Sequence, residues 1–144
     1  MIDKLEFTQR LLFRAQNDLR SAEDLLKTER PATDVICFHC QQAAEKMLKA
    51  WVQWHDIQAP RTHNLTEILE LCRRIDPAFG QLESIDVLTP YAVEVRYADD
   101  FYQPTLREAK IAAADAKRVE RFVITKFQGL GVEAIKDFSD GPVG

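Results

Sequence analysis

The stretch VICFHCQQAAEKMLKAWVQWH, residues 35–55, has the apolar spacing that decides the fold. At about 100° per residue, its small and apolar residues occupy an arc of about 200° around one helix. We therefore predict a long helix that is buried over most of its circumference. The arc holds Ile36, Cys37, Cys40, Ala43, Ala44, Met47, Leu48, Ala50, Trp51, Val52 and Trp54, and the predicted exposed side holds His39, Gln42, Glu45, Lys46 and Lys49.

This arc is wider than a helix on the rim of a small bundle requires. Large aromatic residues such as Trp51 and Trp54 are enriched at interfaces between proteins. We therefore expect part of the arc to face a second subunit and the chain to form a homodimer.

Cys37, His39 and Cys40 raise the question of a metal or nucleophile site within this helix. The helical spacing puts both cysteines on the apolar arc and His39 on the polar side, so the three side chains do not converge on one point. Cys72, His55 and His63 add no paired ligand spacing typical of tetrahedral zinc. An apolar setting also opposes thiolate formation, so we predict three buried, reduced thiols, no disulfide, no metal and no cofactor.

The composition describes a single helical domain. The chain has 144 residues, of which 46% are hydrophobic and 29% charged, with only 5 Gly and 6 Pro. A formal charge of -4 provides no global basic field for nucleic acid or for an anionic membrane, so such binding would need a local patch. No long apolar segment or export signal is evident, so we expect a cytoplasmic protein with no membrane association.

The flanking segments predict further helices. Apolar residues recur at helical spacing from Leu5 to Leu26, and Pro31 should end that helix near Thr28. Thr33 or Asp34 can cap the helix described above.

Asn64-Leu-Thr-Glu67 resembles a capping box and opens a helix that buries Leu65, Ile68, Leu69 and Cys72. Leu82, Ile85 and Leu88 indicate a short helical piece, and Thr89-Pro90 reads as the start of another.

Thr105-Leu-Arg-Glu108 is a true capping box before a last helix, which buries Ala109, Ala113, Ala116, Val119 and Val123 and reaches Phe127. The fold predicted from these segments is all-α, an antiparallel up-and-down bundle of four main helices with one or two short ones. The domain should span residues 1–128, with 129–144 as a loosely held tail.

Arg96 and Tyr97 form the remaining chemical candidate, in the segment VRYADDFYQP, residues 95–104. An arginine beside aromatic residues can hold a phosphate and stack on a base. The structural alternative is an ion pair between Arg96 and Asp99 or Asp100, and the residues alone favour this alternative.

Four segments together resemble the HEPN domain, a family named for higher eukaryotes and prokaryotes and for nucleotide binding. They are the first helix with AQNDL (15–19) and AEDLL (22–26), QQAAEKMLKA (41–50), THNL (62–65) and RYAD (96–99). The resemblance covers roughly residues 8–127 and implies a helical bundle that often dimerises. Many such proteins are encoded beside, or fused to, a minimal nucleotidyltransferase in two-part modules.

Other HEPN branches are ribonucleases and toxins, in which the resemblance places an arginine four to six residues before a histidine, across a dimer. Arg96 matches that arginine, but residues 100–102 are Asp-Phe-Tyr, and no histidine follows His63. Tyr or Asp is a poorer choice than His for exchanging a proton near neutral pH.

The leading hypothesis is therefore a non-catalytic HEPN protein of a toxin–antitoxin-like module, which binds a nucleotide or a partner minimal nucleotidyltransferase. The predicted ligand-binding residues are Arg96, Tyr97, Lys46, Lys49 and His63. One alternative is a metal-independent RNase-type toxin that uses Arg96, with RNA as its ligand. Another is a structural oligomerisation domain.

Overall fold

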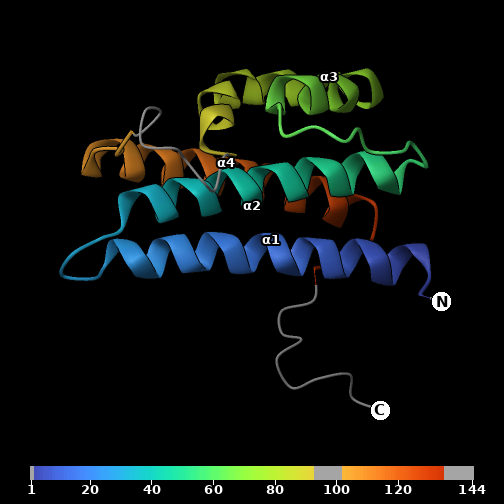
Figure 1. The fold of residues 1–144 in the computed structure, drawn as a ribbon. Helices are drawn as coiled ribbons and strands as arrows, with labels where there is room; N and C mark the ends of the chain where they lie inside the picture. The colour runs from blue at the N-terminus through green and yellow to red at the C-terminus, as the bar shows by residue number, and fades with distance from the viewer. Residues whose placement is uncertain (1, 93–101, 135–144) are drawn as a thin grey trace, which may run out of the picture.

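The computed structural model describes residues 2–92 and 102–134, which form an all-α bundle (Figure 1). The α-helices are α1 (Lys4–Leu26), α2 (Thr33–Trp54), α3 (Leu65–Ile75) and α4 (Leu106–Gly129), and a 3₁₀ stretch, η1, spans Pro77–Ala92. The prediction of an all-α helical bundle is confirmed, and the described residues contain no β-strand. None of the described helices combines the length and apolar character that crossing a membrane requires.

α1 and α2 are antiparallel, as their short connection predicts. Lys4 at the start of α1 lies 3.6 Å from the carboxylate of Asp56, which follows the end of α2. Asp18, further along α1, contacts His39 near the start of α2.

α3 runs in the same direction as α2, because residues 55–64 first return along α2. His63, just before α3, contacts Glu45 in the middle of α2, and the Cys72 thiol then donates to the carbonyl oxygen of Leu48. A connection of this length spans up to about 33 Å when extended, which is enough to run back over the last turns of α2.

α4 also runs in the direction of α2, and η1 runs back between α3 and α4. Thr33 at the start of α2 bonds to Pro104 just before α4, and near the other ends Trp51 packs on Phe127. η1 therefore supplies the reverse-running element between α3 and α4. The predicted up-and-down order of the four main helices is wrong in this respect, because α2, α3 and α4 run in one direction and only α1 and η1 run against them.

α2 is the central helix of the bundle. In Figure 1 it lies between α1 and α3, with α4 behind it. Its broad apolar arc is consequently covered by the chain's own helices. Trp51 is only 3% exposed and packs on Phe79 and Phe127, with ring centroids 5.1 and 5.2 Å away, while Trp54 is half-buried. The placement of Trp51 at a subunit interface is therefore wrong, and the homodimer stays a prediction without this support.

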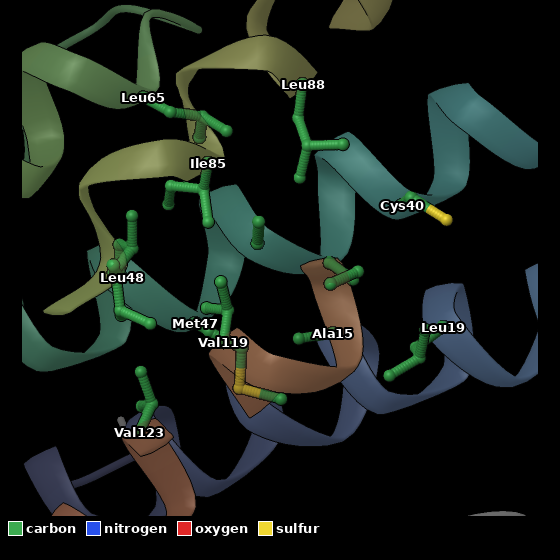
Figure 2. Close-up of a cluster of buried hydrophobic side chains, with 14 of the residues drawn as sticks. Ala15, Leu19, Cys40, Met47, Leu48, Leu65, Ile85, Leu88, Val119 and Val123 are labelled. Atoms are coloured by element: carbon green, nitrogen blue, oxygen red, sulfur yellow. The ribbon is translucent and has the colours of Figure 1, made fainter. Parts of the chain in front are cut away.

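Side chains from every element meet in the core. Figure 2 shows Ala15 and Leu19 of α1, Met47 and Leu48 of α2, Leu65 of α3, Ile85 and Leu88 of η1, and Val119 and Val123 of α4. The small residues predicted for α4 are buried, which allows its close approach to α2.

Two predicted caps have other partners. The N-cap of α2 is Ala32, which makes no side-chain bond, and not Thr33 or Asp34. The Thr33 hydroxyl instead donates to the Pro104 carbonyl oxygen at 2.6 Å, tying α2 to the entrance of α4. Thr89 lies inside η1 and does not begin a new helix. Its hydroxyl accepts a bond from the Leu65 N–H at 3.2 Å, so it satisfies a free donor at the start of α3.

The other caps form as predicted. The Asn64 side chain accepts bonds from the N–H groups of Thr66 and Glu67, and Thr105 and Glu108 make a reciprocal capping box.

Beyond α4, Val132 is buried, and the Gln9 amide donates to the Glu133 carbonyl oxygen at 2.8 Å. The remainder of the predicted tail, 135–144, and most of the short helix predicted after Pro90 lie outside the described residues.

Candidate functional site

The polar side of α2 is enclosed, although the sequence predicts that it is exposed. Glu45 is 6% exposed and Gln41 is fully buried, while Gln42, Lys46 and Lys49 are half-buried. The prediction of an exposed side is wrong because α1 and the segment before α3 flank this face. We call Gln41, Gln42, Glu45, Lys46 and Lys49, together with their partners Asp18, His39 and His63, the α2 polar stripe.

Glu45 is the centre of one half of the stripe. Its carboxylate accepts bonds from Gln41 Nε2 at 3.1 Å, Lys49 Nζ at 3.1 Å and His63 Nδ1 at 2.7 Å. Burial alone raises the pKa of Glu45, but the bonds from Gln41, His63 and Lys49 outweigh burial and hold that pKa below its ordinary value. Glu45 is therefore an ionised carboxylate with its charge neutralised by neighbours.

Gln41 extends this half of the stripe to the backbone. Its amide nitrogen also donates to the His63 carbonyl oxygen at 3.1 Å, and its amide oxygen accepts a bond from Gln42 Nε2 at 2.7 Å. A buried amide is costly unless it is bonded, and both ends of this one are satisfied. Gln41 and Glu45 together fix the segment that leads into α3.

Asp18 of α1 is the centre of the other half. One carboxylate oxygen lies 3.1 Å from His39 Nδ1, and the other is paired with Lys46 Nζ. The Asp18 side chain is only 15% exposed. This half of the stripe joins α1 to α2.

The structure brings Lys49 and His63 together on Glu45 but directs Lys46 to Asp18. Both lysines, predicted as ligand-binding residues, are therefore already paired with carboxylates. His63 differs from them because its side chain is 65% exposed while its Nδ1 is held by Glu45. Arg96 and Tyr97 lie outside the described residues.

The described residues on either side of 93–101 converge on Glu108 in the first turn of α4. The Tyr102 hydroxyl lies 2.5 and 2.6 Å from the two Glu108 carboxylate oxygens, and the Tyr91 hydroxyl donates at 3.2 Å. The bond to Glu108 raises the pKa of Tyr102, and burial raises that of Tyr91. The sequence predicts Glu108 only as a capping residue, because nothing in helical spacing connects it with Tyr91.

The model of the HEPN domain family matches residues 8–127. The chain belongs to the HEPN domain family. Searches of curated proteins and of solved structures gave no match. The family assignment therefore rests on the family model, which covers the described bundle from α1 to the last turn of α4.

The cysteines of this HEPN domain are packing residues. Cys37, Cys40 and Cys72 are buried and unpaired. Burial raises the pKa of Cys37 to about 11 and that of Cys72 to about 12, and it raises that of Cys40 still further. Thiolate nucleophiles are thereby disfavoured. Within residues 2–92 and 102–134, no three His, Cys, Asp or Glu side chains are grouped to hold a metal ion.

Proposed function

We propose that this HEPN domain protein acts by binding and not by catalysis. Its ligand is a nucleotide or a partner minimal nucleotidyltransferase, in a two-component, toxin–antitoxin-like module. The observation that carries the proposal is the absence of any histidine after His63, so Arg96 has no histidine to complete the ribonuclease pair implied by the family.

Tyr102 supports a non-catalytic role. Tyr102 is the last of residues 100–102, the positions at which the ribonuclease branch has its histidine. Its hydroxyl is hydrogen-bonded to the Glu108 carboxylate. A general base for RNA cleavage works best with a pKa near the working pH. The carboxylate of Glu108 moves the pKa of Tyr102 upward, away from that range.

The three histidines of the chain also have local partners. His39 contacts Asp18, His63 contacts Glu45, and the His55 ring packs on Trp51 with centroids 4.6 Å apart. Each thereby has a structural role within the bundle.

Ligand binding is expected to depend on Arg96 more than on the lysines of α2. Lys46 and Lys49 are both ion-paired, so a phosphate would have to compete with Asp18 and Glu45 for them. An arginine can bind a phosphate through two parallel bonds, and Tyr97 next to it offers a ring for base stacking.

The test combines an activity assay with binding assays. Purified protein is incubated with fluorescent RNA in EDTA, titrated with ATP and GTP by calorimetry, and co-purified with the product of a neighbouring nucleotidyltransferase gene. We expect no RNA cleavage, and binding that Arg96→Ala weakens by about tenfold or more, as for loss of a charge-assisted bidentate contact. Arg61→Ala, at an exposed arginine before α3, is the matched control.

Two results would contradict the proposal. Metal-independent RNA cleavage that Arg96→Ala abolishes in a folded protein would establish the RNase-type alternative. A protein that binds no nucleotide and no nucleotidyltransferase would leave the structural oligomerisation domain.

A further inference from the structure

The outer face of α4 carries a line of cations. Arg107, Lys110, Ala114, Arg118 and Arg121 follow one another at three- and four-residue spacing, and all are exposed. At about 100° per residue they lie roughly opposite the buried side of the helix. The cations form two pairs, Arg107 with Lys110 and Arg118 with Arg121. Arg107 and Arg118 are about 17 Å apart along the helix axis. We call these five residues, with Leu106 and Ile111, the α4 face.

The charges of the α4 face are of one sign. The acidic residues of the helix, Glu108, Asp115 and Glu120, are half-buried and lie to its sides. This segregation contrasts with the formal charge of -4 for the whole chain. An exposed array of one sign in an acidic protein creates a local positive potential.

The cations of this face do little for the fold. Among the described residues, Arg107, Lys110 and Arg121 have no ion-pair or hydrogen-bond partner, and Arg118 donates one bond, to the Ser84 hydroxyl at 2.5 Å. Binding an acidic partner would therefore break no internal ion pair of these side chains.

Apolar side chains lie among the cations. Leu106 is 44% exposed and Ile111 is 48% exposed. Together with Arg107, Lys110 and Ala114 they line a shallow hollow near the start of α4. Protein interfaces typically have an apolar centre with a charged rim, and arginine is enriched in them.

We propose that the α4 face docks an acidic amphipathic helix of a protein partner. Such a helix would present two pairs of Glu or Asp about three turns apart, with Leu or Ala between them to fill the hollow at Ile111. The proposal is independent of Arg96 and of the α2 polar stripe, so it does not depend on the proposed function.

Charge and chemistry favour this occupant over two others. In a two-fold symmetric dimer this face would meet its own copy and bring like charges together. Single-stranded RNA would match the cations, but it also uses aromatic side chains for stacking, and the α4 face has none. A protein partner would bury the exposed side chains of Leu106 and Ile111 against its own apolar residues, whereas a phosphate backbone offers no apolar surface to cover them.

The test uses a synthetic helical peptide of about 18 residues with the Glu pairs and apolar centre described above. Fluorescence anisotropy measures its binding to the full-length protein. We expect Arg107→Glu/Lys110→Glu to weaken binding by about tenfold or more, and Ile111→Asn, which keeps every charge, to weaken it by several-fold. Lys27→Glu/Arg30→Glu, at exposed residues between α1 and α2, makes the same charge change and should leave binding within about twofold.

Circular dichroism checks that each variant is folded, and a labelled oligouridylate and the protein's own mass by light scattering are measured in parallel. Three results would overturn the proposal. The first is that the peptide does not bind at low salt. The second is that Ile111→Asn leaves peptide binding unchanged. The third is that the peptide does not bind, while the protein binds oligouridylate or self-associates in a way that depends on Arg107 and Lys110.

Discussion

Replacing Glu45 by alanine should destabilise the protein more than any comparable change at an exposed carboxylate. The Glu45 side chain is 7% exposed and receives bonds from Gln41, Lys49 and His63. Its removal deletes all three bonds and uncouples α2 from the segment that leads into α3. The helices themselves keep their caps and apolar contacts, so we expect a weakened but folded bundle.

The exposure of each partner sets the size of the effect. Lys49 is 19% exposed and His63 is 65% exposed, so both can regain water, and Gln41 keeps its bond to the His63 carbonyl oxygen. The cost should therefore fall below the 3–5 kcal/mol typical of a stranded buried charge, at about 2–3 kcal/mol. For a chain of 144 residues this corresponds to a fall in Tm of about 5–10 °C.

Urea unfolding followed by circular dichroism measures this difference, with Glu70→Ala as the control. Glu70 is an exposed α3 carboxylate that pairs with Arg73 and Arg74 only at 3.8 Å, so its loss should cost less than about 0.5 kcal/mol. Because the folded pKa of Glu45 is lowered, its contribution is complete above the ordinary value of 4.5 and is lost as pH falls through the folded value. Equal costs for the two variants at neutral pH would refute the reasoning.

Three further predictions follow from buried groups. Cys37, Cys40 and Cys72 should not react with a disulfide reagent in the native protein and should all react in guanidinium, because burial raises each pKa; rapid native reaction would contradict this. Burial lowers the pKa of His55, so stability should fall as pH drops below 6.5, and His55→Gln should reduce that slope in urea titrations. Thr33→Val removes the bond that the hydroxyl donates to Pro104 and the bond that it accepts from Gln103, and it should cost about 1 kcal/mol by thermal unfolding; a neutral effect would mean that neither bond contributes to stability.

The sequence could predict the helices because their signals are local. The apolar spacing of residues 35–55 and the capping box at Thr105 depend only on neighbours a few residues away. The direction of α3 depends on residues 55–64 returning along α2, which no helical period encodes. Thr33 likewise has a partner at Pro104, so its hydroxyl binds a distant carbonyl in preference to capping its own helix.

The candidate site is harder to predict, because helical spacing alone places the polar residues of α2 at the surface. Glu45 is buried since His63, from a segment eighteen residues away, covers it and satisfies its charge. Asp18 covers Lys46 and His39 in the same way from α1. Spacing along α2 gives the direction of each side chain but not what lies opposite it on another element. The ion pair of Lys46 with Asp18 therefore required the structure, whereas Lys49 and Glu45 pair at the four-residue spacing of their own helix.

The run QQAAEK, residues 41–46, is the strongest part of the resemblance to the HEPN family, and its structural roles explain what that resemblance can establish. Gln41 and Glu45 hold the segment before α3, Lys46 holds α1, and Ala43 and Ala44 are buried where helices approach closely. Each role builds the bundle, and none leaves a free chemical group. A match to this run therefore indicates how the chain folds. Differences in function within the family should arise elsewhere, where substitution leaves the contacts between helices intact, as on the outer face of α4.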